Sequence, residues 1–170
     1  MSMEIVIIAH NIRSLHNLGS IFRTGEGFGV KKIYLSGTTA NPHSSLPHVQ
    51  AKLWRQLHKT ALGAEKMVDS KYVVEITTLI KRLGREGWQI IGLEQDPRAI
   101  SLPNYCRDRP CNKTCKIALL LGEEVHGITP ELRGLCDDLL EIPMQGRKES
   151  FNVSVAAGIA LYALTTAEKN

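Results

Sequence analysis

The sequence predicts an α/β protein in which a parallel β-sheet is covered by helices on both faces. Short apolar runs rich in β-branched residues alternate along the chain with longer segments whose apolar residues recur at helical spacing. The connections between these segments are short, as they are in β-α-β units. Several of the short runs are apolar throughout, which is typical of strands buried on both faces of a sheet.

The first part of the chain reads as a strand, a helix and a second strand. Residues 4–9 are too few for a helix and predict a buried strand. A helix follows, for which Asn17 is a candidate N-cap, and glycines end it. Residues 32–36 predict the next strand, which a right-handed crossover would place parallel to the first. The polar, turn-rich residues 37–47 predict a surface loop, the first place where we expect substrate contacts.

The rest of the chain continues the alternation of helices and strands. We expect helices over about 48–58, 76–83 and 130–136 and from 152 onward, strands over 89–93, 116–121 and 138–142, and a loop over 96–114. The C-terminal strand, loop and helix, residues 138–163, should form a ligand crevice. This follows because N–H groups at the amino end of a helix lack partners and attract polar groups.

Length and composition indicate one soluble globular domain. The 170 residues are enough for a single domain, so we expect one domain over 1–170. The 43% apolar and 22% charged residues are ordinary, and the net charge of +4 slightly favours an anionic partner. No basic leader is visible, and no apolar stretch reaches the roughly 18–20 residues that a membrane span needs. We expect a cytoplasmic protein.

The four cysteines do not predict a metal site. Cys106, Cys111 and Cys115 lie close together in the expected loop, and Cys136 follows at the end of a short helix. Their spacing is not the paired C-x-x-C of a zinc ribbon, and no nearby histidine completes a set. We therefore expect reduced thiols and no metal.

Three polar clusters interrupt the apolar elements: Asn17 with Arg23, Glu124 after a glycine turn, and Ser150 with Asn152. Each follows a predicted strand or begins the next helix, so all three could meet at the carboxyl edge of one sheet. Each also has an ordinary structural explanation. The two asparagines are possible helix caps, the arginine a partner in a surface ion pair, and the glutamate a solvated carboxylate in a turn.

Familiar catalytic motifs of other enzyme classes are missing from the sequence. It contains no Ser-His-Asp order, nucleophile elbow, Walker loop or H-E-x-x-H, and no G-x-G-x-x-G follows the first strand. A hydrolase or a P-loop enzyme is therefore not favoured.

Taken together, the clusters resemble the motifs of the SpoU/TrmH family of the SPOUT superfamily, the RNA 2′-O-ribose methyltransferases that use S-adenosylmethionine. N-x-G-x-x-x-R occurs at 17–23, L-G-x-E-x-x-G at 121–127, and I-P-M-x-G with S-[LF]-N-V-S-x-A at 142–146 and 150–156. Three motifs in order over nearly the whole chain make the resemblance specific. Phe151 stands where the family usually has leucine, a conservative departure.

The resemblance implies a fold, an assembly and a cofactor. The C-terminal part would thread into a deep trefoil knot, an exception to unknotted topology, and the protein would be a homodimer. The methyl donor would sit in the knot. The matching positions in this sequence are Gly122, Ile142 and Phe151, with Leu93 and Met144 as neighbours.

The resemblance also implies catalytic roles. Arg23 would activate the ribose 2′-OH, while Asn17, Glu124, Ser150 and Asn152 would place it and the substrate, with no metal required. A guanidinium normally stays protonated, so a literal base is one possibility and a charge stabiliser is the other. A permanently charged, bidentate donor suits binding of a phosphate and stabilisation of a developing alkoxide.

The implied substrate is structured RNA, and we favour tRNA over rRNA. The family often carries an additional RNA-binding domain, and a catalytic domain without one must recognise a compact RNA with its own surface. The basic residues that are candidates for this contact are Arg13, Lys52, Arg55, Lys59, Arg107, Arg109, Lys113, Arg147 and Lys148.

Two other functions stay open beside this one. The first is a noncatalytic RNA-binding protein that keeps the knot, and the second is an unrelated dinucleotide-binding oxidoreductase. Calorimetry with the methyl donor tests the first, and a titration with NAD tests the second.

Overall fold

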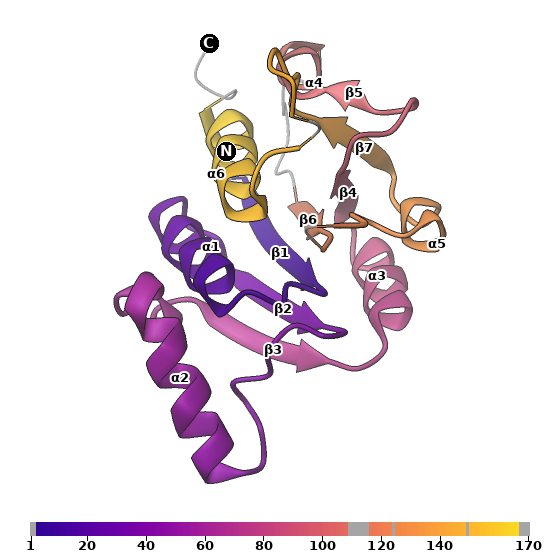
Figure 1. The fold of residues 1–170 in the computed structure, drawn as a ribbon. Helices are drawn as coiled ribbons and strands as arrows, with labels where there is room; N and C mark the ends of the chain where they lie inside the picture. The colour runs from indigo at the N-terminus through magenta and orange to yellow at the C-terminus, as the bar shows by residue number, and fades with distance from the viewer. Residues whose placement is uncertain (1–2, 109–115, 124, 149, 167–170) are drawn as a thin grey trace.

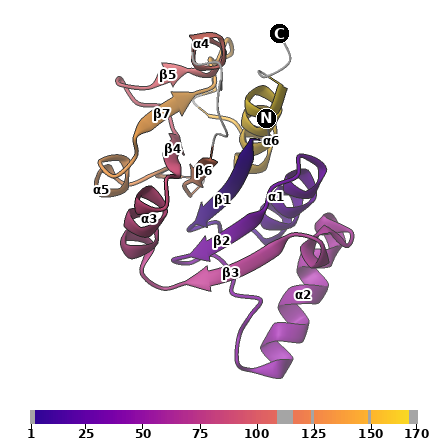
Figure 2. The same ribbon diagram turned by 180° about the vertical axis from the view of Figure 1, so that it is seen from behind.

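A parallel β-sheet runs through the centre of the protein in the computed structural model, with helices on both faces (Figures 1 and 2). The structure describes residues 3–108, 116–123, 125–148 and 150–166. The strands are β1 (Glu4–His10), β2 (Lys32–Ser36), β3 (Asp69–Val73), β4 (Gln89–Leu93), β5 (Ile100–Ser101), β6 (Lys116–Leu121) and β7 (Asp138–Glu141). The helices are α1 (Leu15–Gly27), α2 (Pro47–Ala61), α3 (Ile76–Arg85), α4 (Leu102–Asp108), α5 (Pro130–Arg133) and α6 (Val153–Thr166), with a 3₁₀ turn η1 (Ala64–Lys66).

The seven strands lie in the order β3-β2-β1-β6-β4-β7-β5, and every neighbouring pair is parallel. The predicted α/β class with a parallel sheet is therefore confirmed. Because the strand order changes direction between β1 and β4, the carboxyl ends of the central strands leave room for a crevice there. In the part of the chain that the structure describes, no helix is both long enough and apolar enough to cross a membrane.

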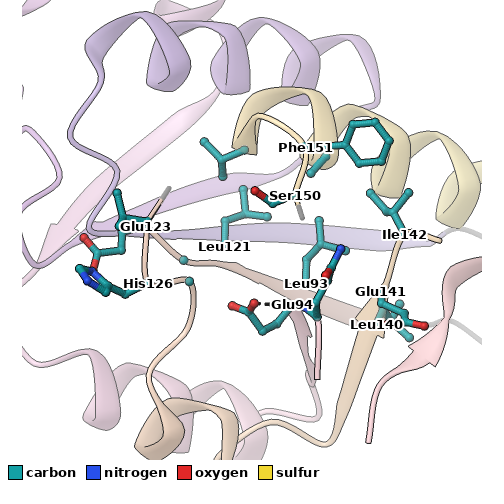
Figure 3. A pocket seen from close by; sticks show the side chains of 16 residues that line it. Leu93, Glu94, Leu121, Glu123, His126, Leu140, Glu141, Ile142, Ser150 and Phe151 are labelled. Carbon is teal, nitrogen blue, oxygen red and sulfur yellow. Dashed lines mark hydrogen bonds and ion pairs between the residues drawn. The ribbon is translucent and has the colours of Figure 1, made fainter. Parts of the chain in front are cut away.

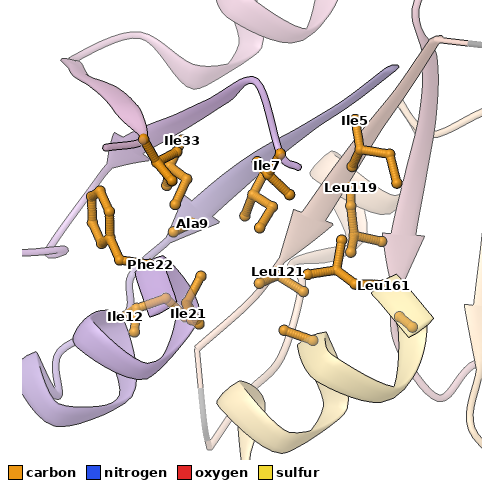
Figure 4. Packing of buried hydrophobic residues seen from close by; sticks show 14 of the residues in the cluster. Ile5, Ile7, Ala9, Ile12, Ile21, Phe22, Ile33, Leu119, Leu121 and Leu161 are labelled. Carbon is orange, nitrogen blue, oxygen red and sulfur yellow. The ribbon is translucent and has the colours of Figure 1, made fainter. Parts of the chain in front are cut away.

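The sheet separates two apolar layers, because successive side chains of a strand point to opposite faces. On β1, Ile5, Ile7 and Ala9 face α1 and α6, and Figure 4 shows Phe22 and Leu161 closing over this layer. The alternate β1 residues belong to a second cluster with α3 and α5. The helices on both faces were expected from the alternation of elements along the sequence.

Three local expectations were wrong. Ser14, rather than Asn17, caps α1, since its hydroxyl accepts the backbone N–H of Asn17 at 3.2 Å. The stretch 96–114, expected to be a loop, contains β5 and α4. The strand β3 was not predicted; it lies at the edge of the sheet, and none of its residues is buried, so it lacks the apolar pattern of the central strands.

The glycine of the first motif has a packing role. A Cβ on Gly19 would collide with Thr60 Oγ1 and would lie 2.7 Å from the Leu57 carbonyl oxygen, both on α2. Only a residue without a side chain lets α1 and α2 approach this closely. The glycine therefore permits close packing of the two helices.

Candidate ligand site at the carboxyl edge of the sheet

A cavity of about 280 Å³ lies where β4, β6 and β7 end, beside the start of α6. Figure 3 shows Leu93 and Leu121 in its middle, with Glu123 and His126 toward one end and Ile142 toward the other. The carboxyl ends of parallel strands are where α/β proteins bind their ligands. This is the crevice expected from the order of strand, loop and helix at the C-terminus.

The loop after β6 is folded tightly against the end of β4. A Cβ on Gly122 would lie 2.5 Å from the Gly127 carbonyl oxygen and 2.6 Å from the Ile128 nitrogen, and both of these are backbone atoms. The Gly127 N–H donates to the Glu123 carbonyl at 3.0 Å, and the Ile128 N–H donates to the Glu94 carboxylate at 2.5 Å. The loop backbone therefore forms a wall of the cavity, and the glycines permit it.

Glu94 is a functional candidate that the sequence reasoning missed. It follows the buried strand β4 directly, lines the cavity, and holds the loop after β6 through the bond to Ile128. Gly127 has a φ of 65°, and any side chain there would run into the Glu94 carboxylate. An acidic residue directly after an apolar strand was the available signal.

A polar chain of contacts continues from the cavity toward β1. The Glu123 carboxylate pairs with His126 Nδ1 at 2.8 Å and with the Arg13 guanidinium at 3.3 Å. Next to it, His10 Nδ1 lies 2.9 Å from Ser36 Oγ. Burial lowers the pKa of His10, and the negative charge of Glu123 offsets part of this effect. Glu123 and His126 were also missed, because the motif pointed to the neighbouring glutamate, and Arg13 was expected only at an RNA surface.

Four of the five residues expected around the methyl donor line this cavity: Leu93, Gly122, Ile142 and Phe151. Met144 is half-buried in the segment after β7 and is not among the lining residues. The expected neighbours thus come from three separate strand ends and from the segment before α6.

Asn17 and Asn152, which are 135 residues apart in the sequence, are joined directly. The Asn152 amide Nδ2 donates to Asn17 Oδ1 at 3.1 Å. The Asn152 side-chain oxygen also accepts the Ser154 backbone N–H at 2.9 Å, so this residue caps α6. From the sequence, Asn152 was either a helix cap or a member of a polar cluster with Asn17. The structure shows that it is both.

The remaining expected catalytic residues are placed differently from one another. Ser150 lines the cavity, directly before α6. Arg23 is exposed on α1 and is not a lining residue of the cavity. Glu124 lies outside the described residues. The chain therefore places Ser150 at the cavity and leaves Arg23 exposed outside the cavity lining.

The charges around the cavity restrict the ligand. Three carboxylates, those of Glu94, Glu123 and Glu141, are among its lining residues, and none of the described lining residues is a lysine or arginine. Glu123 is already paired with Arg13, so the remaining negative charge is that of Glu94 and Glu141; it favours a ligand that carries positive charge and opposes one that carries phosphates. The leucine and isoleucine side chains offer an apolar surface to the rest of the ligand.

The cysteine thiols that the structure describes are free. Burial raises the pKa of Cys106, and burial with the nearby Asp137 carboxylate raises the pKa of Cys136 to about 11. Cys111 and Cys115 lie outside the described residues. Among the described His, Cys, Asp and Glu side chains, no group of three is placed to hold a metal ion.

The basic residues expected at an RNA surface are dispersed. Arg13 pairs with Glu123 as above, and Arg107 pairs with Asp108 at 2.8 Å. Lys52, Arg55 and Lys59 are exposed along α2. The other expected residues are Arg147 and Lys148, both exposed after β7, and Arg109 and Lys113, both outside the described residues.

The sheet and the cavity define a doubly wound α/β protein with a cavity at the carboxyl ends of its central strands. A model of the SpoU rRNA Methylase family matches residues 4–162. The chain belongs to this family, as the three motifs had indicated.

Relatives with established names resemble the chain over most of its length. A 23S rRNA (guanosine-2′-O-)-methyltransferase from Coxiella burnetii is 29% identical over 93% of this chain and 56% of its own length. A tRNA (guanosine(18)-2′-O)-methyltransferase from Borreliella burgdorferi is 26% identical over 94% of this chain and 65% of its own. The chain thus spans between about half and two thirds of these relatives.

Solved structures share the fold. An AdoMet-bound rRNA methyltransferase from Sinorhizobium meliloti superposes with a TM-score of 0.79 at 24% identity, over 98% of this chain and 57% of its own.

Proposed function

We propose that this protein transfers a methyl group from S-adenosylmethionine to a ribose 2′-OH of RNA. The observation that carries the proposal is the cavity, which is built from the second and third motifs and lined by carboxylates without lysine or arginine. This lining suits a donor that carries a sulfonium and an ammonium beside a single carboxylate, which gives a net positive charge, and no phosphate. Family membership and the activities named for the relatives from Coxiella and Borreliella support the same reaction.

The residues of the cavity divide into groups with different tasks. When bound, the donor supplies a methyl group on a positively charged sulfur. Leu93, Leu121 and Ile142 cover apolar parts of it, and the Glu94 and Glu141 carboxylates balance positive charge. Ser150 lies at the cavity where a hydroxyl acceptor would enter. The pair of Asn152 and Asn17 keeps the start of α6, and with it Ser150, in position against α1.

Methyl transfer is an in-line displacement: the bond from the methyl carbon to sulfur breaks with its electron pair staying on sulfur, a bond to the ribose oxygen forms, and the hydroxyl proton passes to solvent water. Alignment is the main task of the protein. We assign Arg23 to the stabilisation of charge on the ribose oxygen and to phosphate binding, because a guanidinium does not give up its proton near neutral pH. Glu124 completes the proposed catalytic set.

We further propose a homodimer. The helix α6 carries exposed apolar side chains: Val155 is 49% exposed and Tyr162 61%, and Phe151 just before the helix is 41% exposed. Phe28, which directly follows α1, packs edge to face on Tyr162 at 6.4 Å between ring centroids, so the apolar surface continues to the end of α1. Exposed apolar surface of this kind marks an interface. Docking of a second subunit here gives Arg23, on the helix that ends just before Phe28, a neighbour beyond its own chain.

The trefoil knot, the single domain and the location belong to the same proposal. The strand β6 lies between β1 and β4, and after β7 the chain returns to pack α6 against α1, an arrangement that supports threading of the C-terminal part. Residues 1–170 act as one SPOUT domain, and the enzyme works in the cytoplasm, where its RNA is found.

Among RNA substrates we favour tRNA over rRNA. A compact RNA offers loops and splayed bases to a small protein surface. The relatives carry names of both classes, so methylation of rRNA is the alternative. The noncatalytic alternative is opposed by the intact motif residues. A dinucleotide oxidoreductase is opposed by the carboxylates around the cavity, which repel a pyrophosphate.

The test is nucleoside mass spectrometry of bulk tRNA and rRNA after incubation with purified protein and S-adenosylmethionine. We expect new 2′-O-methylated nucleosides in tRNA and none with Arg23→Ala. Arg85→Ala, which removes an arginine from α3 on the other face of the sheet, should be as active as the wild type. Donor binding by calorimetry without transfer to either RNA would contradict the reaction, and absence of donor binding would refute the enzyme assignment.

A further inference from the structure

A second cavity, of about 650 Å³, lies away from the first, between α2 and the edge strand β3. Its lining residues come from the loop before α2, from α2 itself, from η1 and from the first two residues of β3. In both ribbon views α2 projects past the β3 edge of the sheet (Figures 1 and 2). The cavity has the size of small-molecule sites, which range over roughly 300–1,000 Å³.

Two rings at right angles form part of the cavity wall. The rings of His43 and Trp54 pack edge to face, with 5.7 Å between their centroids and 87° between their planes. A hydrogen bond also positions the His43 ring: its Nε2 lies 2.9 Å from Ser70 Oγ on β3. Trp54 is only half-buried, although its inner side packs against the core. A flat, unsaturated group is the natural partner for such a surface.

The positive charges at this cavity are available, while its negative charges are already engaged. Glu65 is buried; its carboxylate lies 2.7 Å from His58 Nδ1 and accepts the Gly63 N–H at 2.9 Å. Asp69 pairs with Lys32 at 2.6 Å. Arg55 and Lys66 are exposed at the cavity, and within the described ranges neither has an ion pair or hydrogen bond through its side chain. The unmatched charge at this site is therefore positive.

Burial would raise the pKa of Glu65, but its hydrogen bonds with His58 and with backbone N–H groups lower the pKa overall. The carboxylate is therefore ionised near neutral pH and is satisfied within the protein. It supports the cavity wall, and its negative charge is balanced within the protein, so it does not select for a cationic ligand.

Aromatic side chains beside unpaired cations are the combination that binds single-stranded nucleic acid, because every base has a π-face and every nucleotide a phosphate. Resting on the proposed RNA substrate, we propose that this cavity is an anchoring subsite for an unpaired nucleotide of the RNA. The base stacks on the Trp54 ring, with the perpendicular His43 ring at its edge, and the flanking phosphate lies against Arg55 and Lys66.

The position of the cavity fits an anchor for a nucleotide other than the methylated one. Two strands separate β3 from β6, and three separate β3 from β4. Four strands separate β3 from β7. With about 4.8 Å between neighbouring strands, the strands of the two cavities are roughly 14–24 Å apart, and the second cavity touches the first residues of β3 whereas the first lies at the carboxyl ends of its strands. The subsite therefore contacts the substrate several nucleotides from the reacting ribose and contributes to the choice of RNA.

Fluorescence of Trp54 tests the subsite without activity. The sequence has two tryptophans, so Trp88→Phe leaves Trp54 as the sole reporter. We expect quenching when a short single-stranded oligoribonucleotide of mixed sequence, or bulk tRNA, is titrated into this variant. Unchanged emission at saturating RNA, measured separately by filter binding, would overturn the proposal.

Variants then measure the contribution of each group to RNA affinity. Trp54→Ala should weaken RNA binding roughly 5- to 150-fold, as loss of one stacked base does, and Trp54→Phe should restore most of it. Arg55→Ala, an exposed change with little risk to folding, should reduce the slope of log affinity against log salt by about 1. Lys81→Ala, an equally exposed change on α3, is the matched control and should leave affinity and slope unchanged.

The outcome for the subsite can be separated from the outcome for the proposed function. If the wild type methylates RNA but Arg55→Ala keeps the wild-type KM for RNA and the wild-type salt slope, the subsite is refuted and the function stands. If the wild type methylates no RNA while Trp54 is quenched and Arg55→Ala weakens binding, the subsite stands and the function fails. Binding of S-adenosylmethionine should be the same in all these variants.

Discussion

Replacement of Gly122 by alanine tests whether the loop after β6 forms the donor cavity. The added Cβ would meet three backbone atoms of Gly127 and Ile128, the two nearest non-carbon ones at 2.5 and 2.6 Å. Backbone atoms cannot move aside as a flexible side chain can, so the loop must lift from the end of β6. Lifting breaks the bond from the Gly127 N–H to the Glu123 carbonyl and the bond from the Ile128 N–H to the Glu94 carboxylate.

The size of the effect follows from these two bonds. The first is worth about 0.5–1.5 kcal/mol and the charge-assisted one about 1.5–3 kcal/mol. Replacing glycine by alanine also lowers the conformational entropy of the unfolded chain, which stabilises the folded state by about 0.4–1 kcal/mol and offsets part of this loss. We expect the free energy of unfolding to fall by about 1–4 kcal/mol. For a domain of this length, Tm should fall by about 2–16 °C.

Thermal unfolding by circular dichroism and calorimetry with S-adenosylmethionine are the two assays. Donor binding should be lost well below the Tm of the variant, because the displaced loop is a wall of the cavity. Gly146→Ala is the matched control, since nothing lies within 4 Å of a Cβ at that exposed position. The reasoning is refuted if Gly122→Ala unfolds and binds the donor as Gly146→Ala does.

Two further predictions concern the cap of α6 and the loop after β4. Asn152→Ala should lower the free energy of unfolding by about 1–2 kcal/mol through loss of the cap, whereas Asn152→Asp should keep the cap acceptor and lose the donation to Asn17; equal Tm values for the two variants would contradict this. Hydrogen bonds and charge from Arg98, with charge from Arg133, lower the pKa of Asp96 to about 2. Because this folded-state pKa is below the unfolded value near 3.9, the stabilisation is complete above about pH 4 and is lost as pH falls toward 2. The Tm difference between wild type and Asp96→Asn should therefore be constant from pH 7 to about pH 5 and shrink below pH 4, and a difference that persists at pH 2 would exclude this role.

Elements with strong apolar signals were predicted well. The strands β1, β2, β4 and β6 lie within a residue of their predicted bounds, because central strands of a parallel sheet are apolar on both faces. The edge strand β3 has no such signal, since pairing with β2 alone holds it. The cap of α1 was assigned to Asn17 instead of Ser14, since both residue types cap helices and the sequence contains both.

The candidate site also contains residues that the sequence predicted and residues that it did not. The motifs indicated Gly122, Ile142, Phe151 and Ser150, and the structure places all four around one cavity. Glu94 could not be ranked from the sequence, because its importance comes from a hydrogen bond to the backbone of Ile128, 34 residues away.

The sequence by itself determined the α/β class, the order of most elements and the family, because periodicity and short motifs are local properties of a chain. Only the tertiary structure decided which distant residues meet. It joined Asn17 to Asn152, hydrogen-bonded the Glu94 carboxylate to the loop after β6, and placed His43 and Trp54 beside β3. These contacts depend on strand order and helix packing, which are set by burial of the whole apolar core and leave no mark at any single position.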